Sequence, residues 1–130
     1  MLGTAGAAMA GGFDACSPAT GKAVYKPSVV DNKIEVPLSL FDSNPYQVIS
    51  PDKFQYELAV EKKNKDTYRA LLLRCTHHDN QLTETGNGFT CSLHGSRFDK
   101  EGNVLKGPAE IPLQQLRTQI TKTSLLIYLI

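Results

Sequence analysis

The chain has no tryptophan, only three cysteines and three histidines, and no long run of apolar residues. An odd number of cysteines argues against a closed disulfide framework, and a chain of 130 residues does not need one to fold. Without a stretch of about 20 apolar residues, no segment is expected to span a bilayer. A formal net charge of +1 leaves no basic excess, so we expect no nucleic-acid partner. This length suits one domain with one hydrophobic core.

The N-terminal segment differs in composition from the rest of the chain. Residues 1–20 begin with small, uncharged residues rich in glycine and alanine, and the first charge is Asp14. This composition resembles the apolar part of an export signal without its basic start, which a true start codon upstream of Met1 would supply. Cys16 is then a candidate for lipid anchoring, although Asp14 fits a lipobox poorly, and a flexible tail is the alternative. We therefore predict a signal-like or flexible segment at residues 1–20 and a folded domain at residues 21–130.

Short β-favouring segments alternate with turn signals after residue 32, and no window of ten residues shows a helical period. Residues 68–74 hold too many consecutive apolar side chains for a strand with one wet face, so this strand is expected to be central. The charged segment 61–66 is typical of a hairpin connection. The pattern predicts an all-β fold, an antiparallel sandwich or barrel. The expected strands are 33–38, 46–49, 54–60, 68–74, 116–121 and 125–130, the last two paired as a hairpin.

The scarcest ligand types gather in one short segment. Cys75 and His77 form a C-x-H box, thirteen residues follow, and Cys91 and His94 form a C-x-x-H box. Sulfur and imidazole donors this close together indicate a metal site. A structural zinc site is the alternative, since two cysteines and two histidines also make a tetrahedral set. Zinc fingers, however, place a cysteine pair before a histidine pair, whereas here the two types alternate and no helix is expected to follow.

This pattern, continued by Gly95-Ser96 and by a second loop at residues 107–109, resembles the Rieske iron–sulfur family over residues 33–130. The resemblance implies a [2Fe–2S] cluster in a Rieske domain at residues 21–130, with a small cluster-binding subdomain at about residues 75–110. One iron would take two thiolates and the other two imidazoles. The oxidised cluster would then be neutral, so adding an electron costs less than in an all-cysteine cluster. The implied ligands are Cys75, His77, Cys91 and His94.

Neighbouring residues are expected to tune the cluster. In cytochrome bc-type members of the family, the serine of an H-G-S motif donates to a bridging sulfide, and a tyrosine two residues later donates to a ligand cysteine. This chain keeps Ser96 but has Phe98 at the tyrosine position. Those members also carry a disulfide between the ligand loops, at positions that match Asn80 and Leu93 here, so that cross-link is expected to be absent.

Two further residue roles follow from the pattern. Gly107 and Pro108 resemble the loop that covers the third side of the cluster, because a rigid proline beside a permissive glycine suits a cover; a plain surface turn is the alternative. His78 follows a ligand directly but is expected to be a solvated side chain, since C-x-H selects His77.

Two functions stay open. The first is an exported electron carrier, periplasmic or membrane-associated through an N-terminal anchor, linked to a respiratory or quinol-oxidising chain. The second is a cytoplasmic Rieske ferredoxin that feeds a dioxygenase-type oxygenase, which the Cys-Ser-Leu-His box favours; the signal-like start and the H-G-S motif favour the first. The redox partner would be a quinol-oxidising complex, a cytochrome or an oxygenase. The chain is too short to be an oxygenase itself, so we expect a carrier or an oxidoreductase subunit rather than a stand-alone catalyst.

Overall fold

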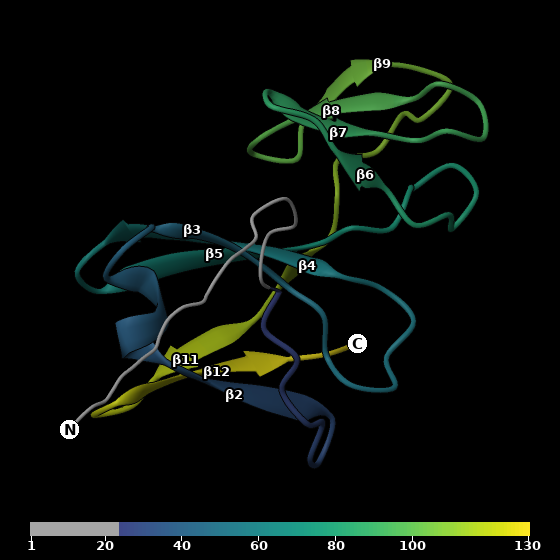
Figure 1. Ribbon diagram of the computed structural model, residues 1–130. Coiled ribbons are helices and arrows are strands. Elements are labelled where there is room, and N and C mark those ends of the chain that lie inside the picture. Colours follow the sequence, from purple (N-terminus) through teal and green to yellow (C-terminus); the bar gives the residue numbers. More distant parts are fainter. Residues whose placement is uncertain (1–23) are drawn as a thin grey trace, which may run out of the picture.

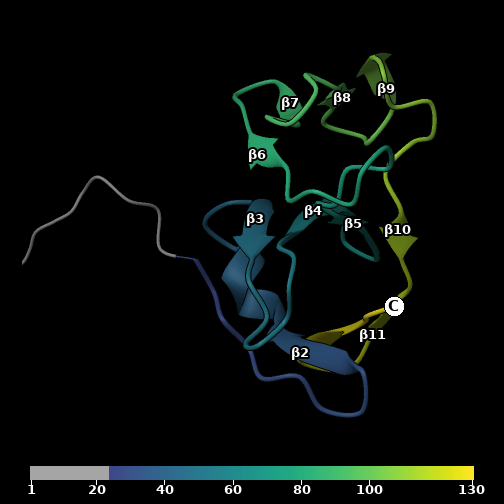
Figure 2. The ribbon, with the colours of Figure 1, turned by 90° about the vertical axis from the view of Figure 1, so that its right-hand side faces the viewer.

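The computed structural model describes residues 24–130, which form three antiparallel sheets arranged in tiers (Figures 1 and 2). The predictions for residues 1–20, including that for Cys16, lie outside the described residues. The all-β prediction is confirmed. Between residues 24 and 130 no helix is long and apolar enough to cross a membrane. Among the described residues, η1 (Leu38–Phe41) forms a short 3₁₀ helix.

Two sheets form the base of the molecule. The first has the order β10-β5-β4-β3 and the second the order β11-β12-β2. The strands of the first sheet are β3 (Tyr46–Ile49), β4 (Leu58–Asn64), β5 (Thr67–Leu72) and β10 (Gln115–Leu116). Those of the second are β2 (Lys33–Pro37), β11 (Thr118–Ile120) and β12 (Ser124–Tyr128).

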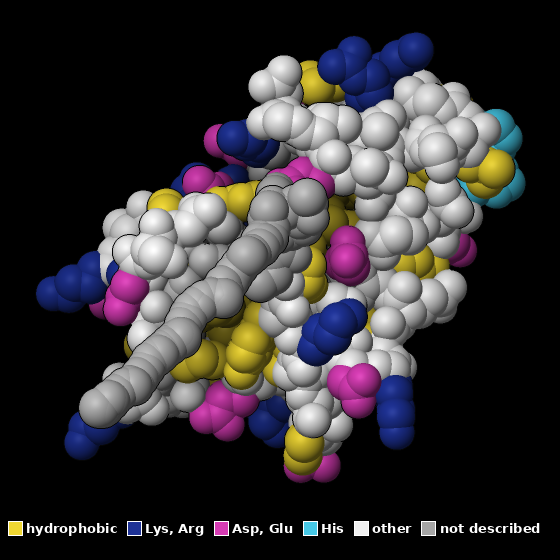
Figure 3. Space-filling model, viewed as in Figure 1, with side chains coloured by type: hydrophobic (Ala, Val, Ile, Leu, Met, Phe, Trp, Pro, Cys, Tyr) yellow, Lys and Arg dark blue, Asp and Glu magenta, His cyan; other side chains and the backbone are white. Residues whose placement is uncertain are grey.

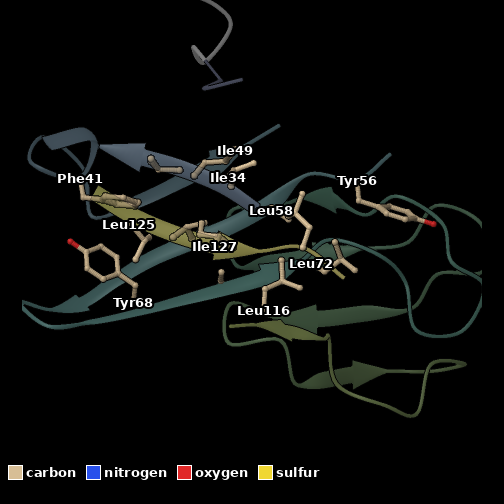
Figure 4. Packing of buried hydrophobic residues seen from close by; sticks show 14 residues of the cluster. Ile34, Phe41, Ile49, Tyr56, Leu58, Tyr68, Leu72, Leu116, Leu125 and Ile127 are labelled. Carbon is tan, nitrogen blue, oxygen red and sulfur yellow. The ribbon is translucent and has the colours of Figure 1, made fainter. Parts of the chain in front are cut away.

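The main hydrophobic core lies between these two sheets (Figure 4). Ile34 from β2 and Ile127 from β12 pack with Leu58 and Leu72 from the first sheet, and all four side chains are buried. Alternation along each strand directs these residues inward, as the period of two requires. Burying one such side chain contributes roughly 1.5–3 kcal/mol, so this sandwich holds the base together.

The β4–β5 pair is buried on both faces. Leu72 faces the main core, whereas Ala59, Leu71 and Leu73 join a second core together with the residues of the upper sheet. This double burial explains the apolar run at residues 68–74 and confirms that β5 is central, since it lies between β4 and β10.

The upper sheet carries the predicted cluster loops. It has the order β6-β7-β8-β9, with β6 (Thr83–Glu84), β7 (Gly88–Thr90), β8 (Arg97–Asp99) and β9 (Val104–Lys106). The chain enters this sheet after β5 and returns to the base at β10. The Leu72 N–H donates to the Gln114 carbonyl oxygen at 2.9 Å, so the two connections lie side by side.

Two strand predictions were misplaced. The charged segment 61–66 is not all connection, because β4 continues to Asn64 and pairs with Thr67. The Asp66 N–H donates to the Asn64 side-chain oxygen at 3.0 Å, which closes a shorter turn than the charge pattern suggested. The segment 54–57 lies outside β4. The hairpin between β11 and β12 is confirmed, with the Thr121 N–H donating to the Ser124 carbonyl oxygen at 2.8 Å. The strand expected at 116–121 is divided, because β10 pairs with β5 in the first sheet and β11 with β12 in the second.

Candidate metal centre

The two ligand boxes fold into loops of the same hydrogen-bond pattern. In the first loop the Cys75 N–H donates to the Asn80 carbonyl oxygen and the Asp79 N–H donates to the Cys75 carbonyl oxygen, both at 2.8 Å. In the second loop Cys91 donates to Ser96 at 2.8 Å and Gly95 to Cys91 at 2.9 Å, again between backbone groups. Each cysteine therefore begins a tight turn that ends five residues later.

The turns need a left-handed residue at their fourth step. Gly95 has a φ of 83° and Asp79 a φ of 55°. Glycine adopts this conformation freely, and aspartate is among the few other residues that tolerate it. Both loops therefore reverse in the same way, although their histidines stand at different steps of the turn.

The sulfur and imidazole donors differ sharply in exposure. Cys75 and Cys91 are each 1% exposed and belong to the second core. His77 and His94 are exposed, with ring centroids 5.3 Å apart. The histidines gather at one end of the molecule beside hydrophobic atoms (Figure 3). The structure thus brings the two thiols together in the interior and the two imidazoles together at the surface, and their joint role as ligands stays a prediction.

His78 joins the exposed imidazoles. Its ring lies 4.4 Å from that of His77 and 4.9 Å from that of His94, and the ligand nitrogens of the three residues lie within 4.8 Å of one another. The spacing of the two boxes does not predict this closeness. His78 stays predicted as a solvated side chain, and its ring is exposed.

Cys91 is placed to act as a thiolate. Burial by itself raises the pKa of this thiol, but backbone N–H groups of Leu93 and His94, with the side chains of Cys75 and Asn80, bring the pKa below its ordinary value. A lowered pKa favours the deprotonated form that a metal requires. The loop therefore favours the thiolate form of Cys91.

Ser96 offers a buried hydroxyl to the site. Its side chain is fully buried, and its oxygen accepts the Ala109 N–H at 3.0 Å. Within residues 24–130 no acceptor is found for the hydroxyl proton itself. Because a buried donor without a partner is costly, this proton fits an acceptor that belongs to a bound group, such as a cluster sulfide.

A third loop closes the site from the side. Ala109 binds Ser96 as described, and the Thr76 hydroxyl donates to the Ile111 carbonyl oxygen at 2.6 Å, which ties this loop to the first ligand loop. Gly107 and Pro108, the predicted cover, are both exposed and precede the buried Ala109. The peptide bond between them is cis. They precede the residue that contacts Ser96, and their role as a cover stays a prediction.

The base supports the site through side chains that the sequence analysis missed. The Tyr56 hydroxyl donates to the Asp79 carbonyl oxygen at 2.6 Å, from the segment before β4 to the first ligand loop. Tyr46 on β3 hydrogen-bonds the Glu84 carboxylate on β6, and burial followed by this charge raises the pKa of Tyr46 well above its usual range. No local motif signals such long-range partners.

The remaining predicted residues have clear positions. Phe98 is buried on β8 in the second core with both cysteines. Leu93 is 53% exposed next to His94. The Asn80 side chain is half-buried and points its amide at the Cys91 sulfur, with 3.7 Å between nitrogen and sulfur. Cys75 and Cys91 are free thiols. The donor set of two thiols and two imidazoles, with the spare Ser96 proton, fits a [2Fe–2S] cluster of mixed ligation.

Comparison with known proteins agrees with an iron–sulfur site in this chain. A family model described as the Rieske [2Fe-2S] domain matches residues 38–117. The cytochrome b6-f complex iron-sulfur subunit 3 of Nostoc sp. strain PCC 7120 is 38% identical over 55 residues, which cover 42% of this chain and 29% of the relative. Subunit 1 of Synechocystis sp. strain PCC 6803 is 34% identical over 55 residues, 41% of this chain and 31% of the relative. The chain thus spans less than a third of these relatives.

Solved structures share the fold more widely. The cyanobacterial plasma membrane Rieske protein PetC3 from Synechocystis PCC 6803 superimposes with a TM-score of 0.54 and 26% identity, covering 72% of this chain and 97% of that chain. A structure of the reduced oxygenase and oxidised ferredoxin complex of carbazole 1,9a-dioxygenase contains a chain with a TM-score of 0.50 and 19% identity, covering 76% of this chain and 94% of that chain. The second likeness shows the fold alone.

Proposed function

Since the chain belongs to the Rieske [2Fe–2S] domain family, we propose that it carries single electrons between redox partner proteins. Its cofactor is a [2Fe–2S] cluster. When bound, that cluster supplies reversible one-electron chemistry. The residues proposed to hold it are Cys75, His77, Cys91 and His94.

The contrast in exposure between the two kinds of donor carries this proposal. The thiols of Cys75 and Cys91 are buried away from water, whereas the rings of His77 and His94 lie at the surface. A partner protein can therefore approach the histidine edge closely, which is what electron transfer between proteins needs. The Ser96 hydroxyl joins the second ligand loop to the third loop.

We further propose that the partner belongs to a respiratory or quinol-oxidising chain. The support is the identity of the relatives, which are cytochrome b6-f subunits, and the plasma-membrane Rieske protein with a similar fold. We propose accordingly that the protein is exported and membrane-associated. The proposed domain organisation is a Rieske domain at residues 21–130 with a cluster subdomain at about residues 75–110. Fractionation of cells that produce the full chain would place it in the membrane or periplasmic fraction; recovery in the cytoplasm would contradict export.

The ligand assignment is tested by single substitutions in the full chain, purified anaerobically. We expect His94→Ala to lose acid-labile sulfide and the EPR signal of the dithionite-reduced protein. His78→Ala is the matched control, because it removes an equally exposed imidazole from the same surface and should keep both. A wild-type protein that binds zinc instead of iron and sulfide, or a His94→Ala protein that keeps the signal, would refute the assignment.

The midpoint potential tests the choice of partner. Rieske centres cover roughly −150 to +300 mV, and a quinol-linked centre needs the upper part of that range so that quinol can reduce it. We therefore expect protein-film voltammetry to give a positive midpoint and a short-chain quinol to reduce the protein. A midpoint near the lower limit would point to a ferredoxin role.

A further inference from the structure

We propose that the side-chain amide of Asn80 is a tuning residue, which donates a hydrogen bond across the two ligand loops to the sulfur of Cys91 and thereby raises the reduction potential. This inference rests on the proposed function, because it needs Cys91 to be a cluster ligand. Asn80 stands at one of the positions where bc-type relatives of the family are expected to carry a loop disulfide. The amide would connect the same two loops without a covalent bond.

The matching turns of the two loops place Asn80 for this role. Asn80 accepts the N–H of Cys75 through its backbone, as Ser96 accepts that of Cys91, so the two residues occupy equivalent fifth steps. The Ser96 hydroxyl is fully buried and accepts the Ala109 N–H. The Asn80 amide instead reaches the cysteine of the opposite loop. The fifth step of each turn thus carries a polar side chain, and that of the first loop contacts a sulfur.

The contact itself is well defined. The Asn80 Nδ2 lies 3.7 Å from the Cys91 Sγ, within hydrogen-bond distance for a sulfur acceptor, and 3.4 Å from the Gln81 carbonyl oxygen. The amide nitrogen carries two hydrogens, so it can donate to the Gln81 carbonyl oxygen and to the Cys91 sulfur at the same time. The side chain is half-buried, so bulk water does not fully screen its dipole.

The sign of the effect follows from charge. Reduction adds one negative charge to the cluster and its thiolates. An N–H dipole aimed at a thiolate therefore stabilises the reduced form more than the oxidised form, which raises the potential. Removing the donor must lower it.

The experiment measures midpoint potentials of the full, cluster-loaded protein by EPR-monitored redox titration. Asn80→Leu keeps the approximate shape and removes the donor, and we expect the equilibrium constant for reduction to fall about three- to tenfold, tenfold being about 59 mV for one electron. Asn80→Asp replaces the donor by a negative charge and should lower the potential further. Should Asn80→Leu not retain its cluster, Asn80→Ala, which also removes the donor without adding a charge, decides in the same way.

Gln81→Met is the matched control. The Gln81 side chain bonds the Glu57 N–H at 3.0 Å and the Leu82 carbonyl oxygen at 2.7 Å, so it holds the same loop without touching sulfur. Its substitution should leave the potential unchanged. An unchanged potential in Asn80→Leu, or an equal fall in Gln81→Met, would overturn the inference while the proposed function stands. Wild-type protein without a reduced-state EPR signal would overturn the proposed function as well.

Discussion

At the residue scale, Phe98 differs from the tyrosine of bc-type relatives by a single hydroxyl. The ring is buried with both cysteines, so an added hydroxyl would enter the sulfur side of the site. A hydrogen bond to a charged group contributes roughly 1.5–3 kcal/mol, but only its difference between redox states changes the potential. We expect Phe98→Tyr to raise the midpoint by tens of millivolts in protein-film voltammetry. Phe41→Tyr, in the main core, is the control; no change or a decrease in Phe98→Tyr would contradict the prediction.

Ser96 combines a tuning and a structural role. We expect Ser96→Ala to lower the midpoint potential. The variant lacks the hydroxyl proton, which has no acceptor within residues 24–130 and would donate to a cluster sulfide. The same change leaves the buried Ala109 N–H without its acceptor, which costs roughly 1–3 kcal/mol of unfolding free energy in urea titrations. Ser92→Ala, an exposed serine of the same loop, should change neither quantity. A fall in stability without a fall in potential would leave Ser96 a purely structural residue.

At the element scale, β7 and β8 approach so closely at one point that only glycine fits. A Cβ on Gly88 would lie 2.1 Å from the Phe98 carbonyl oxygen, which is backbone and cannot turn aside. We expect Gly88→Ala to reduce the unfolding free energy by roughly 3 kcal/mol or more. Gly86→Ala, where nothing lies within 4 Å, should change it by well under 1 kcal/mol, roughly the size typical of surface substitutions. Equal urea midpoints for the two variants would show that the strands separate easily.

Elements and site residues that depend on a local sequence pattern could be predicted, whereas those that depend on contacts between distant segments could not. The hairpin of β11 and β12 and the central β5 follow from local periodicity, and the four expected ligands from a motif of twenty residues. The start of β4 was misplaced because residues 54–57 alternate like a strand but lie outside it, so that Tyr56 can reach Asp79. The Asn80 amide contact depends on how two separate loops meet, which spacing alone does not fix.

At the scale of the whole molecule, the Tyr46–Glu84 hydrogen bond joins the base to the upper sheet. Burial, followed by the negative charge of Glu84, raises the pKa of Tyr46, so the folded state favours the protonated phenol. The stability from this link is complete below the ordinary tyrosine pKa of about 10 and is lost as pH rises above it. We expect unfolding free energies measured from pH 8 to 11 to fall less steeply in Tyr46→Phe than in wild type.

Tyr68 provides the internal comparison. Burial, then the charge of Asp42, also raises its pKa, so part of the alkaline loss should remain when Tyr46 is replaced. In the double variant Tyr46→Phe, Tyr68→Phe the unfolding free energy should depend even less on pH between 8 and 11. Identical pH profiles for wild type and Tyr46→Phe would mean that the two tiers are not coupled through this phenol.

The neighbouring connections to the upper sheet have a consequence for how such proteins diversify. Because the chain leaves β5 and rejoins β10 at positions joined by the Leu72–Gln114 hydrogen bond, residues 73–113 form a cassette with adjacent ends. The strands that pair within the sandwich lie outside the cassette, so a change of loop length inside it need not shift their register. A graft of the cassette from a relative would need two junctions and would also have to keep the second core and the Tyr46 and Tyr56 hydrogen bonds to the base.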